Sequence, residues 1–173
     1  MNLGDALTER PVVLDGGLAT ELERHGADIS GDLWSAALLR DDPGAIVAAH
    51  TAYFAAGARV ATTASYQASF EGFAAAGLGR GEAEALMRRS VGLALEARER
   101  AGLGADAAWV AASVGPYGAV LADGQEYTGV YPAPYDTVAG LRAFHRPRLE
   151  VLASAGADVL ACETIPSLAE VEA

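Results

Sequence analysis

Four short apolar runs recur about every 50 residues along this chain, and helical sequence fills the gaps between them. Each run is too short for a helix and suits a buried strand of a parallel sheet. Strands that alternate with helices in this way form the βα repeat of an α/β fold. The repeat predicts parallel strands near residues 12–14, 59–63, 109–113 and 159–162.

Polar or acidic residues follow the apolar run in every repeat. Asp15 and Glu163 end the first and last runs, and the segments 62–67 and 113–117 end the other two. Because parallel strands place all their carboxyl ends on one side of the sheet, we expect these residues to meet at one rim. Gly16–Gly17 allows a tight turn there and the close approach of a ligand to the backbone.

Helix signals lie between the runs. Asp42–Pro43 is typical of a helix start and Gly57 of a stop, while residues 81–100 form an amphipathic pattern. A further helix is expected over 136–155, broken or restarted at Pro147. The segment 115–134 reads as a long loop, and its aromatic content favours a functional role.

Composition excludes several classes of protein. The chain of 173 residues is long enough for one good core, and its net charge of −11 argues against nucleic acid or an anionic membrane as a partner. It contains no lysine, which removes Schiff-base and P-loop chemistry. No apolar run is long enough to span a bilayer and the N-terminus is polar, so we expect a soluble cytoplasmic protein.

The one cysteine, Cys162, lies inside the last predicted strand, which excludes a disulfide framework. Side chains alternate along a strand, so Cys162 should face the helices if Glu163 faces the sheet's other side. We therefore expect a small buried thiol rather than a metal ligand.

Two architectures suit four βα units. They make half of an eight-stranded barrel, or alternatively a complete small doubly wound sheet. The Gly16–Gly17 turn lacks the G-x-G-x-x-G spacing of a nucleotide-binding sheet, and Asp15 would repel a phosphate there.

Seven motifs in register resemble the homocysteine S-methyltransferase family, in its branch that uses S-methylmethionine or S-adenosylmethionine. They are Asp15-Gly-Gly-Leu-Ala-Thr-Glu-Leu22, Leu33-Trp-Ser-Ala36, Thr63-Ala-Ser-Tyr-Gln-Ala68, Ser113-Val-Gly-Pro-Tyr-Gly-Ala119, Ala122-Asp-Gly-Gln-Glu-Tyr127, Phe144-His-Arg-Pro-Arg148 and Ala161-Cys-Glu-Thr-Ile-Pro166. The resemblance implies a (β/α)8 TIM barrel of about twice this length. Residues 1–173 would be the amino-terminal half of that single domain, covering about its first four βα units.

The resemblance also implies a zinc cofactor held by three cysteines, in a Gly-x-Asn-Cys and a Gly-Gly-Cys-Cys motif. Neither motif occurs in this chain, and both would lie beyond Ala173. In such an enzyme zinc binds and deprotonates the homocysteine thiol, which then attacks the donor methyl. We therefore expect the 173-residue chain alone to be inactive, and its uncovered strand edges to favour self-association.

The family pattern assigns the α-ammonium of homocysteine to Asp15 and Glu163, and its carboxylate to backbone amides near Gly16–Gly17. Two rim carboxylates suit a small cation with three N–H donors, although acids at strand ends also cap the helices that follow them. Further candidates for the substrate pocket are Tyr66 and Gln67, and more weakly Ser65, Trp34, Tyr117 and Tyr127. The face of Tyr66 could hold a sulfonium donor by cation–π attraction, or simply pack.

Other charged residues are interpreted structurally. The three histidines have no metal-like spacing, while Arg146 and Arg148 are expected in helix-to-strand packing or a salt bridge. Two rival functions stay open. One is a barrel glycoside hydrolase that uses Asp15 and Glu163 as its carboxylate pair, and the other is a non-catalytic binding or assembly fragment.

Overall fold

The computed structural model describes residues 1–27, 35–121 and 124–173, and a three-stranded parallel sheet lies at its centre. The strands are β1 (Val60–Thr62), β2 (Trp109–Val114) and β3 (Val159–Cys162), in the order β1–β2–β3. Val60 pairs with Trp109, and Ala111 pairs with Val159. The α/β class and the parallel sheet are confirmed.

The expected first strand at residues 12–14 is reduced to an isolated parallel bridge between Leu14 and Val60. Two backbone hydrogen bonds flank the bridge, from Arg59 N to Val13 O and from Asp15 N to Val60 O. Val13 and Leu14 are exposed, and within the described residues this segment has no strand on its other side. These few ladder hydrogen bonds make the segment too short to count as a strand, but it still brings Asp15 to the sheet.

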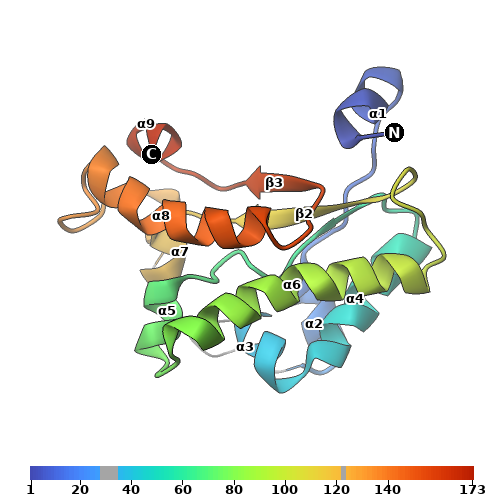
Figure 1. Ribbon diagram of the computed structural model, residues 1–173, viewed down its shortest axis with the longest axis horizontal. Coiled ribbons are helices and arrows are strands. Elements are labelled where there is room, and N and C mark those ends of the chain that lie inside the picture. Colours follow the sequence, from blue (N-terminus) through green and yellow to red (C-terminus); the bar gives the residue numbers. More distant parts are fainter. Residues whose placement is uncertain (28–34, 122–123) are drawn as a thin grey trace.

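Helices cover both faces of the sheet unequally. Figure 1 shows α4, α6 and α8 on one face and the short α1 on the other. The helices are α1 (Leu3–Glu9), α2 (Leu18–Arg24), α3 (Ser35–Asp41), α4 (Pro43–Ala55), α5 (Phe70–Ala75), α6 (Arg80–Arg100), α7 (Gly118–Leu121), the 3-10 helix η1 (Gln125–Tyr127), α8 (Val138–Ala153) and α9 (Leu168–Glu172).

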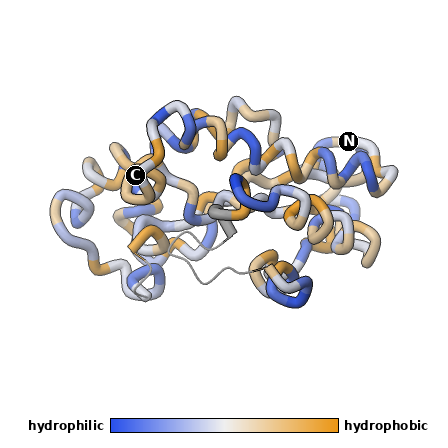
Figure 2. The backbone as a smooth tube through the Cα atoms, turned by 90° about the horizontal axis from the view of Figure 1, so that it is seen from below, coloured by the Kyte–Doolittle hydropathy of each residue, from blue (hydrophilic) through white to orange (hydrophobic). Residues whose placement is uncertain are grey.

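Alternation along the strands builds two separate apolar clusters. Ala61, Val110 and Ala112 face the large cluster under the helices. Val60 and Trp109 face a small one on the opposite side, which Ala6 of α1 helps to close. Figure 2 shows hydrophobic and hydrophilic stretches interspersed along the backbone.

The local helix signals are confirmed. The Asp42 carboxylate accepts a hydrogen bond from Ala45 N at 3.1 Å, and Pro43 occupies the first position of α4. Gly57, just past the end of α4, has a φ of 109°, which a residue with a side chain rarely adopts. Asp42 and Gly57 thus mark the two ends of α4, which precedes β1 in the chain.

Two expectations for the segment after β2 are wrong. Pro147 lies inside a continuous α8 rather than breaking it. Phe144, Arg148 and Leu152 are buried around it, so packing on both sides outweighs the one backbone hydrogen bond that proline removes. The segment 115–134 is also not a plain loop, because it contains α7 and η1.

The expectation of a buried Cys162 is wrong as well, because this free thiol is exposed. Cys162 does lie opposite Glu163, in a cavity of about 540 Å³ that also contacts Leu149 of α8. It is exposed because β3 is the outer strand of the described sheet, and the helices beside its end, α8 and α9, leave an open cavity over the thiol. In the part of the chain that is described, no helix has the length and apolarity to cross a membrane.

Candidate functional site

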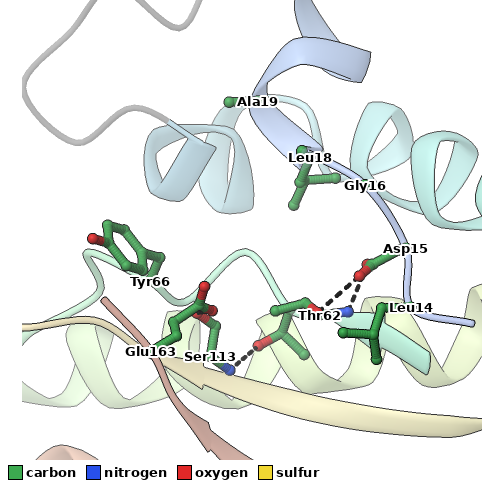
Figure 3. A pocket seen from close by; sticks show the side chains of 11 residues that line it. Leu14, Asp15, Gly16, Leu18, Ala19, Thr62, Tyr66, Ser113 and Glu163 are labelled. Carbon is green, nitrogen blue, oxygen red and sulfur yellow. Dashed lines mark hydrogen bonds between the residues drawn. The ribbon is translucent and has the colours of Figure 1, made fainter. Parts of the chain in front are cut away.

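A cavity of about 400 Å³ opens at the carboxyl ends of the strands (Figure 3). We call it the rim cavity, and the residues that line it are Leu14, Asp15, Gly16, Gly17, Leu18, Ala19, Thr62, Thr63, Tyr66, Ser113 and Glu163. They come from the bridge segment, β1, β2 and β3 and the turns that follow. The expectation that the strand ends of all four repeats meet at one rim is confirmed.

Asp15 is fixed to the end of β1. Thr62 N donates to Asp15 Oδ2 at 2.6 Å, and Thr62 Oγ1 donates to Oδ1 at 2.8 Å (Figure 3). Burial raises the pKa of Asp15, and the negative charge of Glu163 adds to this rise, although the Thr62 hydrogen bonds oppose it. A cation bound between the two carboxylates would relieve both effects.

Glu163 follows β3 and is fixed to the end of β2. Ser113 Oγ donates to Glu163 Oε1 at 2.5 Å, and Ser113 N donates to Thr63 Oγ1 at 3.0 Å. Thr164, the next residue, has a φ of 56°, in the left-handed region that costs a residue other than glycine about 1–2 kcal/mol. The backbone is therefore held in a strained turn beside the carboxylate.

The glycine turn after Asp15 is closely packed. A Cβ atom on Gly16 would lie 2.9 Å from the Tyr53 hydroxyl, which itself donates to Gly17 O at 3.0 Å. Gly17 is the N-cap of α2 and uses no side chain for capping. Backbone N–H groups near this turn thus stay beside the cavity without a side-chain acceptor at the N-cap.

Tyr66 lines the cavity opposite Asp15 and is half-buried. Its ring lies so close to Gly115 that a Cβ there would be 2.6 Å from it. Burial raises the pKa of the Tyr66 hydroxyl, and the negative charges of Glu126 and Glu163 add to the rise, while a hydrogen bond with Thr164 opposes it. The aromatic face and the two carboxylates therefore share one electronegative space, which favours cationic ligands.

Three other candidates lie behind the cavity rather than in its lining. Ser65 Oγ donates to Ser113 O at 2.7 Å, and Gln67 Nε2 donates to Ala119 O at 2.7 Å. Tyr117 stacks on Tyr135 with ring centroids 4.0 Å apart. All three are buried. The Ser65 and Gln67 contacts join the segment that follows β1 to the end of β2 and to α7, whereas Tyr117 packs on a residue just before α8. Trp34 lies outside the described residues, and Tyr127 is 77% exposed.

The sequence reasoning missed single residues that hold the acids. Thr62 and Ser113 were included only as parts of rim segments, yet they donate the hydrogen bonds to Asp15 and Glu163. Their position at strand ends was the available signal. It did not show which acid each hydroxyl would contact, because that depends on the register between strands.

A buried acid on α9 holds the segment after β2. Glu170 accepts hydrogen bonds from Tyr117 N at 2.6 Å and Tyr131 Oη at 2.7 Å, and His145 Nε2 lies 2.9 Å away. Burial alone would raise the pKa of Glu170, but these hydrogen bonds lower it below its usual value.

Arg146 pairs with Glu150 at 3.0 Å, as expected for a surface ion pair.

Several known proteins are similar to this chain in sequence and in fold. A sequence model of a family described as homocysteine S-methyltransferase matches residues 12–173. Homocysteine S-methyltransferase YbgG of Bacillus subtilis strain 168 is 54% identical over 94% of this chain and 52% of its own length. The homocysteine S-methyltransferase of Escherichia coli K12 is 50% identical, with the same coverage. Selenocysteine Se-methyltransferase of Brassica oleracea var. italica is 47% identical over 93% of this chain and 49% of its own length.

The fold comparison agrees. The metallated form of the homocysteine methyltransferase MmuM from Escherichia coli has a TM-score of 0.86 and 48% identity, over 96% of this chain and 58% of that one. The chain therefore spans about half the length of the curated relatives it matches. The family match covers nearly the whole sequence, with Asp15 and Glu163 inside it. The chain belongs to the homocysteine S-methyltransferase family.

Proposed function

We propose that this chain binds homocysteine for methyl transfer from S-methylmethionine or S-adenosylmethionine. Asp15 and Glu163 would hold the α-ammonium group, and backbone amides near Gly16–Gly17 would contact the carboxylate. The observation that carries the proposal is the convergence of the two acids on one cavity. Among the described residues that line this cavity none is basic, so the acids have no internal counter-ion there.

The reaction would exchange one sulfur–methyl bond for another. The S–CH₃ bond of the sulfonium donor breaks, the homocysteine sulfur forms the new S–CH₃ bond, and the thiol proton leaves to solvent. This gives methionine and a neutral thioether. The chain's own contribution would be to hold the amino acid at a fixed angle to the donor, which lowers the entropic barrier. The family match favours this reaction over the glycoside hydrolase alternative.

Tyr66 is the best-placed group for the donor. Its ring borders the same cavity as the two acids, and an aromatic face attracts a sulfonium cation. We place the donor's sulfonium beside Tyr66 and the homocysteine ammonium between Asp15 and Glu163.

We further propose that residues 1–173 form the first half of a (β/α)8 barrel domain. The parallel order β1–β2–β3, the bridge segment before β1 and the half-length coverage of relatives support this arrangement. A barrel would place more strands beyond β3, where Cys162 and Leu160 are now exposed.

The described residues do not fit a zinc site. In residues 1–27, 35–121 and 124–173, no group of three or more His, Cys, Asp or Glu side chains is arranged to hold a metal ion. Cys162 also lies on the opposite side of β3 from Glu163. Zinc dependence is proposed only for the longer family architecture, whose cysteine motifs this sequence lacks.

Calorimetry of the purified chain tests the binding half of the proposal. L-homocysteine should bind, and 4-mercaptobutanoate, which lacks the ammonium group, should bind at least tenfold more weakly, because it loses the charge-assisted hydrogen bonds. Equal affinities would contradict the assignment of Asp15 and Glu163. With S-methylmethionine added, the chain alone should form no methionine, and detectable turnover would overturn that expectation.

A further inference from the structure

Arg148 is fully buried in α8, and its guanidinium bonds to backbone carbonyls rather than to a carboxylate. Arg148 Nη1 donates to Gly115 O at 3.0 Å, and Nη2 donates to Ser65 O at 3.1 Å and Tyr66 O at 2.9 Å. Burial lowers its pKa to about 10, so the group stays charged at neutral pH. Buried charges in proteins are usually paired with an opposite charge. Because Arg148 has hydrogen bonds to carbonyls and, among the described contacts, none to an acid, holding these carbonyls is its structural role.

All three carbonyls belong to the two rim segments that follow β1 and β2. These segments also contact each other directly, because Gly115 N donates to Tyr66 O at 3.2 Å. Arg148 is therefore the shared donor at the point where they meet.

A short chain of hydrogen bonds leads from Arg148 to the substrate acid. Arg148 holds Ser65 O, Ser65 Oγ donates to Ser113 O at 2.7 Å, and Ser113 Oγ donates to Glu163. A shift of the Ser65 carbonyl would thus change the position of the Glu163 carboxylate. The ring of Tyr66 depends on the same anchor, since its own carbonyl is one of the acceptors.

Glu170 completes the fixation from the other side. It accepts from Tyr117 N, two residues after the Gly115 carbonyl that Arg148 holds. A buried cation therefore fixes one end of the segment Gly115–Tyr117 and a buried anion fixes the other. Each of the two charged side chains forms hydrogen bonds with the backbone of a rim segment. Among the described contacts there is no hydrogen bond between Arg148 and Glu170.

We propose that Arg148 is a positioning residue for substrate binding, which sets the placement of Tyr66 and Glu163 by clamping the rim carbonyls from behind. This inference rests on the proposed function for the identity of the ligand. Its chemistry favours arginine over lysine, because only the planar fork reaches carbonyls of two segments at once.

Arg148→Lys and Arg148→Met test the clamp in the 173-residue chain. Both should fold, by circular dichroism, but bind L-homocysteine at least tenfold more weakly, with Lys retaining more affinity than Met. Arg146→Met, on the exposed side of the same helix, is the matched control and should bind as the parent does. Leu152→Ala, buried in α8 but away from the rim carbonyls, provides a comparison at similar loss of melting temperature.

Affinity in Arg148→Lys within twofold of the parent, or a loss equal to that of Leu152→Ala at the same melting temperature, would overturn the proposal. Amide hydrogen exchange tests the clamp independently of any ligand. Segments 63–67 and 113–117 should lose protection selectively in the Arg148 variants and not in Leu152→Ala. If the parent binds no homocysteine, the proposed function fails, while uniform exchange changes would reject the clamp itself.

Discussion

Ser113 Oγ lies 2.5 Å from Glu163 Oε1 and joins the carboxyl ends of β2 and β3 at the rim cavity. The two residues are 50 positions apart in the sequence, and the parallel register that pairs Ser113 with Ala161 brings them together. One hydroxyl thus fixes the carboxylate that we assign to the substrate ammonium.

Ser113→Ala should weaken L-homocysteine binding about 10- to 100-fold, because Glu163 loses the hydrogen bond that orients it and a bond to a charged group is worth about 1.5–3 kcal/mol. Calorimetry at pH 7.5 measures the change. Ser90→Ala is the matched control, since Ser90 is also buried but donates to Met87 O within α6. An unchanged affinity in Ser113→Ala would mean that Glu163 needs no orientation or does not bind the ligand.

Asp15→Asn should reduce L-homocysteine affinity by about 10- to 100-fold, because the amide keeps the shape but removes one of the two negative charges. Thr62 N can still donate to the amide oxygen, so the variant should fold. Asp106→Asn, at an exposed position away from the rim, is the control. Binding of 4-mercaptobutanoate should be unaffected by Asp15→Asn, and an equal loss for both ligands would argue for a purely structural role.

His50 makes the fold sensitive to acid. It is fully buried in α4, neither ring nitrogen has a hydrogen-bond partner in the described structure, and burial lowers its pKa to about 4. In the unfolded chain a histidine titrates near pH 6.5, so between those two values the unfolded state binds more protons. This contribution to stability is therefore complete above about pH 6.5, is lost progressively as the pH drops from about 6.5 to about 4, and changes little below that.

At pH 4.5 this histidine should remove about 2–3 kcal/mol of unfolding free energy relative to pH 7.5. Urea unfolding of His50→Leu and of the parent at both pH values isolates the effect, because leucine has no proton to bind. The exposed His25→Asn variant serves as the control. The same pH dependence in His50→Leu as in the parent would assign the acid sensitivity to other groups.

The positions of the strand ends were predictable from the sequence, but the hydrogen bonds that hold these ends in place were not. The βα period placed Asp15 and Glu163 on one rim because parallel strands share their direction, which needs no side-chain detail. Arg148 could not be assigned in the same way. Its three acceptors are backbone carbonyls of distant segments. Every residue has such a carbonyl, so the residue types do not indicate which carbonyls Arg148 contacts.

Exposure was also hard to predict near β3. Cys162 occupies the side of the strand that was expected, but whether that side is buried depends on how closely the neighbouring helices pack over it, and α8 and α9 leave an open cavity there. Pro147 shows the opposite case. Its local rule predicted a break, while the buried residues on both sides of it keep α8 continuous. Tertiary packing decided both outcomes.

Self-association should follow from the apolar side chains at the β3 edge. Leu160 of β3 is 39% exposed, and Val171 of α9, which lines the same cavity as Cys162, is 66% exposed. Among the described strands β3 has β2 as its one neighbour. We expect a concentration-dependent dimer or larger species in light scattering at micromolar chain. Leu160→Asp should shift the chain toward monomer, because it would bury a charge in any contact at this edge. Leu7→Asp, at a leucine on α1 that is 58% exposed, should leave the size distribution unchanged. A monodisperse parent at all concentrations would contradict the expectation, and equal effects of both variants would move the contact away from β3.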